Sequence, residues 1–207
     1  MQLGCGTALP SLFLFQAAMA LRASRPSGTA PPLSLLVADY NPTVLQLVTL
    51  PNLLLAWALA HKDTSPALRE ALSDEKDIEL TPQVLAAFES YLIAEGITLS
   101  FVSGGWSPEF VELLYSFSGG EADVMVLGAE TIYSPFALNA FVEIMFALLR
   151  REDRAVAVVA AKRLYFGVGG SLDDFIEKAK ALGADVVQLR EEADGVRRGV
   201  VQCTLRT

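Results

Sequence analysis

The sequence is poor in the residues that build metal centres and disulfide frameworks. Its 207 residues include two cysteines, Cys5 and Cys203, at opposite ends of the chain, and a single histidine, His61. This spacing provides neither a disulfide framework nor a set of metal ligands, so we expect a reducing compartment and no bound metal. One imidazole next to a lysine and an aspartate does not make a zinc site, and we expect His61 in a solvated loop.

The chain also has little positive charge. It carries 16 Lys and Arg against 24 Asp and Glu, which gives a net charge of −8 and an isoelectric point near 4.7. Such a chain lacks the broad basic surface that binds phosphate backbones, so we expect no direct contact with nucleic acid. An acidic surface attracts basic proteins, but charge of this size is also the ordinary means of keeping a protein soluble.

Charged residues are scarce in general, at 19% of the chain, whereas hydrophobic residues reach 52%. This composition excludes a disordered protein, and the length suits one domain. The most apolar stretches are Leu3–Leu21 and Val44–Ala60. The first has no basic residue before it, and the second contains polar residues and is shorter than the roughly 20 residues of a membrane span. We expect buried helices, no signal peptide and no membrane partner.

Short apolar runs alternate with longer helical patterns, which is typical of βαβ units around a mostly parallel sheet. The expected strands are 33–38, 98–102, 124–129 and 155–161. The expected helices are 8–21, 43–60, 82–95, 107–117, 135–150 and 171–182. The runs 186–189 and 198–205, joined by Asp194-Gly195, predict an antiparallel hairpin at the sheet edge. The fold class is therefore α/β, with residues 1–207 forming a single domain.

Two polar segments are expected to be loops. Residues 22–32, with the sequence RASRPSGTAPP, are rich in serine, glycine and proline and predict an exposed connection between the first helix and the second strand. Residues 61–81 form the polar, charged stretch in the middle of the chain, which we interpret as a flexible insertion. Neither segment separates a second hydrophobic core.

A glycine-rich loop near the N-terminus points to a nucleoside cofactor. Gly4 and Gly6 precede a helix-length apolar stretch, so the backbone can approach a ligand where helix N–H groups are free. The dinucleotide fingerprint requires a third glycine where this chain has Leu9. Asp39 ends the next expected strand, and its carboxylate can accept hydrogen bonds from both ribose hydroxyls. A purely structural turn is the alternative.

Further motifs follow in a characteristic order. The segments LGCGTALPS, VADYNPTVLQLVTLPN, SGGWS, LGAETIYSP and YFGVGGS together resemble the seven-strand, S-adenosylmethionine-dependent methyltransferases, and most closely the histidine protein methyltransferase 1 family. The resemblance covers nearly the whole chain. It implies a Rossmann-like, doubly wound sheet and methylation of a histidine in a large-subunit ribosomal protein. It also implies that cofactor and substrate bind at the carboxyl ends of the strands.

The resemblance assigns roles to individual residues. The implied cofactor-binding residues are Gly4, Cys5, Gly6 and Thr7 around the methionine part, Asp39, Tyr40 and Asn41 around the ribose, Gly105 and Trp106 beside the adenine, and Ala129 near the methyl group. The indole of Trp106 has a face for stacking on a base, although a core aromatic residue at a helix start is the alternative. The implied substrate-binding residues are Phe166, Gly167 and Gly169 in a flexible wall, with a simple tight turn as the alternative.

Two residues of the ETIY segment are the candidate catalytic residues. Transfer of a methyl group from a sulfonium depends on alignment of nucleophile, methyl and sulfur more than on acid–base chemistry. A neutral imidazole has a free lone pair on one nitrogen, and a carboxylate that accepts from the opposite N–H selects which nitrogen faces the methyl. We expect Glu130 to accept that hydrogen bond and Tyr133 to orient the substrate or close the pocket. A helix-capping carboxylate is the alternative for Glu130.

The chain departs from the family pattern at its start. Met1-Gln2 falls inside the expected first, central strand, so we expect that strand to be truncated and the domain to be N-terminally incomplete. Gln2 stands where an acidic residue ordinarily faces the methionine amino group, and it keeps an acceptor without the charge. A truncated, non-catalytic methyltransferase-like protein is therefore one alternative. A protein-lysine methyltransferase and, more distantly, a nicotinamide-dependent oxidoreductase are others.

The expected setting follows from the same interpretation. The cofactor is S-adenosylmethionine and the partner is a protein substrate. We expect a monomer located in the cytoplasm and the nucleus.

Overall fold

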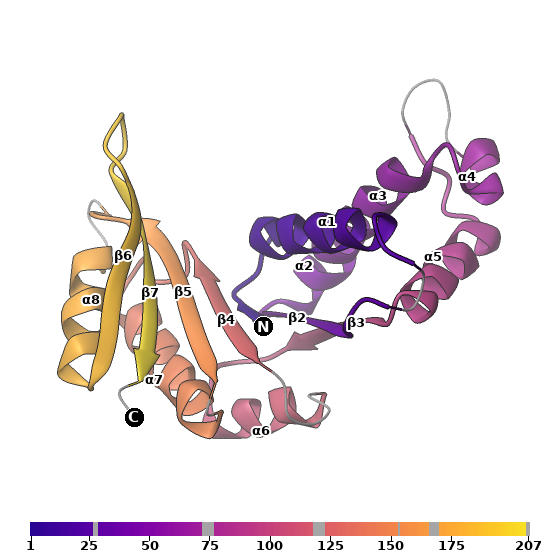
Figure 1. The fold of residues 1–207 in the computed structure, drawn as a ribbon. Helices are drawn as coiled ribbons and strands as arrows, with labels where there is room; N and C mark the ends of the chain where they lie inside the picture. Colours follow the sequence, from indigo (N-terminus) through magenta and orange to yellow (C-terminus); the bar gives the residue numbers. More distant parts are fainter. Residues whose placement is uncertain (27–28, 72–76, 118–122, 153, 166–169, 206–207) are drawn as a thin grey trace.

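The computed structural model describes residues 1–26, 29–71, 77–117, 123–152, 154–165 and 170–205 (Figure 1). They form a seven-stranded sheet in the order β3-β2-β1-β4-β5-β7-β6. The strands are β1 (Gln2–Leu3), β2 (Leu33–Asp39), β3 (Ile97–Ser103), β4 (Val124–Ala129), β5 (Ala155–Lys162), β6 (Ala184–Glu192) and β7 (Arg198–Leu205). β7 runs antiparallel to both of its neighbours, and the other pairs are parallel. The predicted α/β sheet with a C-terminal hairpin is confirmed.

The helices follow the predicted ranges closely, except for α4, which was not predicted. They are α1 (Leu9–Ala23), α2 (Pro42–Val44), α3 (Leu50–His61), α4 (Pro66–Ala71), α5 (Pro82–Ala94), α6 (Pro108–Ser116), α7 (Pro135–Arg151) and α8 (Leu172–Ala181). Four of these helices begin with a capping side chain followed directly by proline, at Asn41, Thr81, Ser107 and Ser134. The side-chain oxygen accepts from a free backbone N–H, and proline fits the first turn because no N–H is needed there.

The helices cover the two faces of the sheet, and alternation along β2 separates the two cores. Leu35 packs in the core formed with α1, α3, α4 and α5, whereas Leu36 packs in the core formed with α6, α7 and α8. Successive side chains of a strand point to opposite faces, so one seven-residue strand contributes to both cores. In Figure 1 the indigo and purple helices α1 to α3 lie on one side of the sheet, and α6 and α7 lie on the other.

The central strand is short, and the strand order reverses around it. Gln2 pairs with Val37 of β2 and Leu127 of β4, and Leu3 is fully buried between the same two strands. β2 leads away from β1 in one direction and β4 in the other, which makes this position the topological switch point of the sheet. Ligands of doubly wound folds bind at the carboxyl ends of the strands at such a point.

The predicted helix 43–60 is interrupted by a π-helical turn, η1 (Leu45–Thr49). Pro51, in the first turn of α3, has no N–H to donate to Leu47, and its ring crowds that carbonyl. The N–H of Leu50 bonds to Leu45 instead, five residues earlier. The sequence contained this signal, because a proline inside a helical pattern predicts a local break.

The first predicted loop begins with a buried residue. Arg22 belongs to α1 and is 6% exposed, and its guanidinium donates to the carbonyls of Ala18, Pro31 and Glu95. The expectation of an exposed loop is therefore wrong at Arg22. A guanidinium has five N–H donors in a fixed plane, so one side chain ties the end of α1 to the segment before β2 and to the end of α5.

The middle segment 61–81 contains regular structure in its described part. Helix α4 occupies Pro66–Ala71, and Leu68 is fully buried in the core with α3 and α5. His61 is not a solvated loop residue: it ends α3, its Nδ1 lies 2.9 Å from the Trp57 carbonyl, and its ring packs on Tyr91. The flexibility expected of this segment stays a prediction.

One continuous helical run, Pro42–His61, is long and apolar enough to cross a membrane by length and composition, with a mean hydropathy of 1.6. Seven of its residues are buried, and they lie on η1 and α3: Leu45, Thr49, Leu53, Leu54, Ala56, Trp57 and Ala58. The interpretation as a buried core helix holds for this face. Leu47 and Leu59 lie on the exposed face.

Candidate functional site

The glycine loop after β1 is held by an acidic side chain. Gly4 and Gly6 have φ values of +60° and +51°, which L side chains rarely adopt. The N–H of Gly6 donates to Oδ2 of Asp39 at 2.9 Å, and the N–H of Asn41 donates to Oδ1 at 3.1 Å. The carboxylate at the end of β2 thus fixes both the glycine loop and the turn that follows it.

The other residues of the loop turn their side chains elsewhere. Cys5 is buried against Leu45 and lies 3.6 Å from the Thr49 hydroxyl, and burial raises the pKa of its thiol to about 11. Thr7 is exposed, and its carbonyl accepts from Asn52 at 3.1 Å. These two residues shape the loop through their backbone, and neither lines the cavity described below.

Gln2 does not face that cavity either. Its side-chain Oε1 accepts from the Ser11 hydroxyl at 2.6 Å and from the Ser11 N–H at 3.1 Å, while its Nε2 donates to the Cys5 carbonyl at 3.4 Å. The residue is 1% exposed. Gln2 thus keeps an acceptor without the charge, as expected, and in this structure the first turn of α1 occupies that acceptor.

A cavity of about 460 Å³ opens where β1, β2 and β4 end. Its lining residues are Gly4, Asp39, Tyr40, Gly104, Gly105, Trp106, Glu130, Thr131, Tyr133, Ser134, Phe136, Ala137 and Ala140. The fold thereby brings together residues predicted from four separate segments of the sequence. Tyr40 and Phe136, which are 79% and 84% exposed, form part of an aromatic rim.

Trp106 lies between the cavity and the core, and its predicted stacking on a base stays a prediction. It lines the cavity, and its ring packs edge-to-face on Phe141 of the core with centroids 5.8 Å apart. Gly104 has a φ of +153°, and its missing side chain leaves room for Phe110 of α6. The SGGW turn therefore presents an indole at the cavity while α6 begins immediately behind it.

Two further predicted residues lie next to the cavity lining. Asn41 caps α2 by accepting from the Thr43 N–H at 2.9 Å, and Ala129 ends β4 opposite Ala160 of β5. The predicted substrate-binding residues Phe166, Gly167 and Gly169 lie outside the described residues. The role assigned to them stays a prediction.

Glu130 is at a special backbone position. Its φ is +58°, and its N–H continues the ladder to the Ala160 carbonyl at 2.9 Å. A left-handed conformation costs a non-glycine residue about 1–2 kcal/mol. The side chain does not cap α7, because Ser134 performs that task, so the helix-cap alternative is wrong.

The Glu130 carboxylate contacts two residues that the sequence analysis did not assign. The Tyr165 hydroxyl donates to Oε2 at 2.8 Å, and Nε of Arg198 lies 3.4 Å from Oε1. Tyr165 begins the YFGVGG motif, so its position was a usable signal. Arg198 lies in β7, far along the chain, and only the register that pairs it with Lys162 brings it here.

Thr131 is another cavity residue that sequence reasoning missed. It is 5% exposed, and its hydroxyl has no hydrogen-bond partner among the described residues. A buried hydroxyl without a partner is unfavourable by about 1–3 kcal/mol, and such groups call for a structural or functional explanation.

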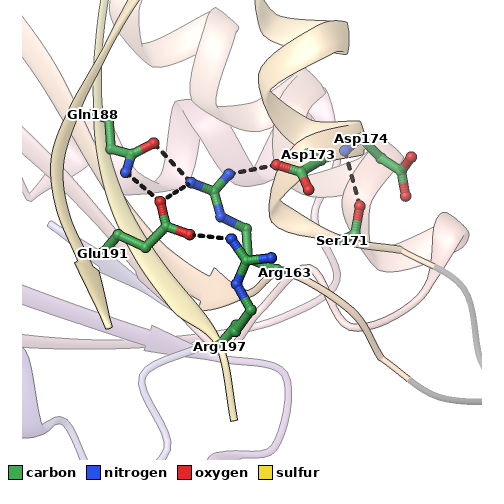
Figure 2. A network of polar contacts seen from close by, with 7 residues as sticks. All are labelled: Arg163, Ser171, Asp173, Asp174, Gln188, Glu191 and Arg197. Atoms are coloured by element: carbon green, nitrogen blue, oxygen red, sulfur yellow. Dashed lines mark hydrogen bonds and ion pairs between the residues drawn. The ribbon is translucent and has the colours of Figure 1, made fainter. Parts of the chain in front are cut away.

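A polar network behind the cavity ties the hairpin to β5 and α8 (Figure 2). Arg163 pairs with Asp173 of α8 and, through Nη2, with Gln188 at 2.7 Å and Glu191 at 3.1 Å. Arg197 donates to the other Glu191 oxygen at 2.7 Å. Hydrogen bonds from Gln188, Arg197 and Arg163 hold the pKa of Glu191 at about 2.

Within the part of the chain that the structure describes, no group of three or more His, Cys, Asp or Glu residues is placed to hold a metal ion. The polar groups at the cavity are one carboxylate at the end of β2, one after β4, and the hydroxyls between them. This donor set suits an organic ligand with hydroxyl and N–H groups.

Comparison with known proteins gives two curated relatives. The chain is 37% identical to histidine protein methyltransferase 1 of Saccharomyces cerevisiae over 182 residues, covering 84% of this chain and 47% of that protein. It is 34% identical to histidine protein methyltransferase 1 of Schizosaccharomyces pombe over 190 residues, covering 92% of this chain and 51% of that protein. The chain thus spans about half the length of these relatives. No protein-family model matches it.

Among solved structures, LepI in complex with SAH and a substrate analogue covers 99% of this chain and 42% of its own, with a TM-score of 0.50 and 12% identity. A structure described as a pericyclic reaction enzyme gives the same values. At such low identity these likenesses show the fold alone. Together with the curated relatives, they show that the chain has a seven-strand methyltransferase fold and is similar in sequence to about half the length of histidine protein methyltransferase 1.

Proposed function

We propose that the chain is an S-adenosylmethionine-dependent protein methyltransferase that acts on a histidine side chain. The observation that carries the proposal is the cavity at the switch point, with Asp39 and Glu130 at the carboxyl ends of the two strands that flank β1. The names of the curated relatives support histidine as the acceptor in preference to lysine.

The cavity residues fit the proposed cofactor. The volume of about 460 Å³ lies in the usual range of small-molecule sites, roughly 300–1,000 Å³. A carboxylate has about four lone-pair sites. Asp39 commits two of its sites to backbone N–H groups, which leaves acceptors for ribose hydroxyls. The unpartnered Thr131 hydroxyl and the Trp106 indole offer a hydrogen bond and a stacking surface.

The chemistry needs positioning more than proton transfer. When bound, S-adenosylmethionine supplies the methyl group, and its sulfur keeps the electron pair of the broken carbon–sulfur bond. One ring nitrogen of the acceptor imidazole uses its lone pair to form the new nitrogen–carbon bond. Glu130 accepts a hydrogen bond from the other ring N–H and stabilises the imidazolium, whose proton then leaves to solvent. Tyr133, at the half-exposed rim, orients the acceptor.

The proposal extends to the setting of the reaction. The substrate is a large-subunit ribosomal protein, and the enzyme works as a monomer in the cytoplasm and nucleus without contacting nucleic acid directly. The net charge of −8 supports a basic protein substrate, because ribosome-bound proteins are generally basic to match RNA phosphates.

Ligand-dependent thermal unfolding is the first test. We expect S-adenosylhomocysteine at 100 times its Kd to stabilise the 207-residue chain by roughly 2.7 kcal/mol, whereas NADH gives no shift. A shift with NADH alone would support an oxidoreductase. A cooperative transition that neither ligand moves would support a non-catalytic relative.

Methyl transfer is the second test. The chain is incubated with radiolabelled S-adenosylmethionine and purified large-subunit ribosomal proteins, and the hydrolysed product is separated by amino-acid chromatography. We expect label in methylhistidine and a rate at least tenfold lower for Glu130→Gln. Label in methyllysine would show that the acceptor assignment is wrong. A parental rate in Glu130→Gln would remove the catalytic role of that residue.

A further inference from the structure

Three elements converge on one carboxylate at the acceptor side of the cavity. Glu130 follows β4, Tyr165 follows β5, and Arg198 begins β7. The left-handed backbone of Glu130 places its side chain where the other two residues reach it. A strained position that persists requires support from its surroundings and is characteristic of functional sites.

The contact with Tyr165 is the stronger of the two. Its distance of 2.8 Å is that of a good hydrogen bond, and the tyrosine side chain is partly buried. The Arg198 contact is 3.4 Å long between side chains that are 50% and 44% exposed. Exposed ion pairs contribute about 0–1 kcal/mol, so Tyr165 determines the orientation of the carboxylate.

The hydrogen bond between Tyr165 and Glu130 has a defined direction, with the tyrosine as the donor. The tyrosine oxygen accepts from the backbone N–H of Lys162 at 3.3 Å, which leaves its one proton for Oε2 of Glu130. Burial and the bond to Glu130 raise the pKa of Tyr165 above its usual value, so the phenol remains a donor at neutral pH. The Lys162 ammonium lies 5.3 Å from the centre of the ring and restricts it further.

The network in Figure 2 keeps these parts in register. Arg163, between Lys162 and Tyr165 in sequence, donates its backbone N–H to the Arg197 carbonyl at 3.0 Å. Its side chain bonds to Asp173 and Glu191. The end of β5 and the start of β7 are thereby fixed to each other, immediately beside the residues that contact Glu130.

We propose that Tyr165 is a positioning residue that holds the Glu130 carboxylate in one orientation and thereby selects which imidazole nitrogen receives the methyl group. The inference rests on the proposed function. With Oε2 held by Tyr165, the remaining lone pairs of the carboxylate meet one ring N–H in a fixed direction, and the other nitrogen faces the methyl. A carboxylate free to rotate accepts from either ring N–H and permits both isomers.

The test compares Tyr165→Phe with the parent chain and with Tyr115→Phe as the matched control. Tyr115 is also partly buried and donates to a carbonyl, that of Leu148, but it lies between α6 and α7 away from the cavity lining. The substrate is the mixture of purified large-subunit ribosomal proteins, and the two methylhistidine isomers are separated after hydrolysis. S-adenosylhomocysteine affinity is measured on the same samples.

We expect the parent and Tyr115→Phe to give one isomer at equal rates. Tyr165→Phe should lower kcat by about 10- to 100-fold, as misplacement of a reacting group does. It should produce the second isomer and leave S-adenosylhomocysteine affinity within about twofold. In a Glu130→Gln background, Tyr165→Phe should have no further effect, because it acts through Glu130.

A parental rate and a single isomer in Tyr165→Phe would overturn the inference, and so would rate losses that multiply with those of Glu130→Gln. A parent chain that binds S-adenosylhomocysteine but forms no methylhistidine would overturn the proposed function instead, and the inference with it. The isomer ratio in an active parent thus separates the two failures.

Discussion

Two carboxylates flank the central strand, and they are held in different ways. Asp39 is bound by backbone N–H groups of two adjacent loops, whereas Glu130 is bound by the side chains of Tyr165 and Arg198. A backbone N–H is available for any residue type except proline, so the hydrogen bonds to Asp39 depend on the shape of the two loops. The Glu130 site depends on residue identity and on how distant strands are paired. The proposed cofactor side thus depends on backbone donors, one of them 33 residues away in the chain, whereas the proposed acceptor side depends on side chains that the strand pairing brings together.

The largest expected difference between the two sides is the loss of stability when a glycine is replaced by alanine. A Cβ at Gly170 would lie 2.6 Å from the Ile132 carbonyl and 2.9 Å from the Ser134 nitrogen, at a φ of +79°. We expect Gly170→Ala to lower the free energy of unfolding by about 3 kcal/mol and the melting temperature by about 6–12 °C. The control is Gly6→Ala on the cofactor side, where φ is +51° but, among the described residues, an added Cβ would meet no atom within 4 Å apart from its chain neighbours. It should cost only about 1 kcal/mol, and equal losses would contradict the comparison.

Asp39→Ala should weaken ligand binding through a change on the cofactor side alone. Removing the carboxylate releases the glycine loop and removes the proposed ribose acceptor. Because charge-assisted hydrogen bonds contribute about 1.5–3 kcal/mol each, we expect S-adenosylhomocysteine affinity to fall about 100-fold in calorimetry. Asp123→Ala is the control, since Asp123 is exposed and pairs with the exposed Arg154 before β5. Unchanged affinity in Asp39→Ala would show that the cavity binds something other than an adenosyl group.

Substitution of two buried threonines should change the stability of the chain by a smaller amount, and in opposite directions. Thr49 donates to the Gly6 carbonyl at 2.7 Å, whereas the Thr131 hydroxyl has no partner in the part of the chain that the structure describes. We expect Thr49→Val to destabilise the chain by about 1 kcal/mol and Thr131→Val to stabilise it by about as much in thermal unfolding. Thr131→Val should also weaken S-adenosylhomocysteine binding. Destabilisation by both substitutions would mean that Thr131 already has a partner.

The smallest effect is an expected lack of reactivity. Burial raises the pKa of Cys5 to about 11 and that of Cys203 to about 12. At pH 8 the Cys5 thiolate fraction is then about one in a thousand, and the thiol is shielded as well. We expect iodoacetamide to label neither cysteine in the folded chain, with or without S-adenosylhomocysteine, and both after unfolding in urea. Fast labelling of Cys5 in the folded chain would show that the glycine loop opens.

Much of the fold was predictable because the local signals agree with one another. Capping residues followed by proline, such as Ser107-Pro108, set helix starts within one residue of the prediction. Alternation and apolar runs located the strands. The errors arose where tertiary contacts override local polarity. Arg22 looked like a loop residue but is buried by its bonds to three carbonyls, and Leu68 in a charged segment packs in a core.

The candidate site divides in the same way. The glycine loop, Asp39, Trp106 and Glu130 stand out in the sequence because each occupies a turn directly after a strand, and in a parallel sheet those turns meet at one edge. Sequence alone does not show that Ser11 occupies the acceptor of Gln2. Arg198 carried no local signal at all.

The sequence by itself determined the α/β class, the order of the elements and the acidic residues at the ends of β2 and β4, since periodicity, capping and turn chemistry act between near neighbours. Only the tertiary structure decided which groups hold those acids. Hydrogen bonds depend on distances of about 3 Å and on direction. The register between β5 and β7 sets that geometry for Glu130 from residues far apart in the chain.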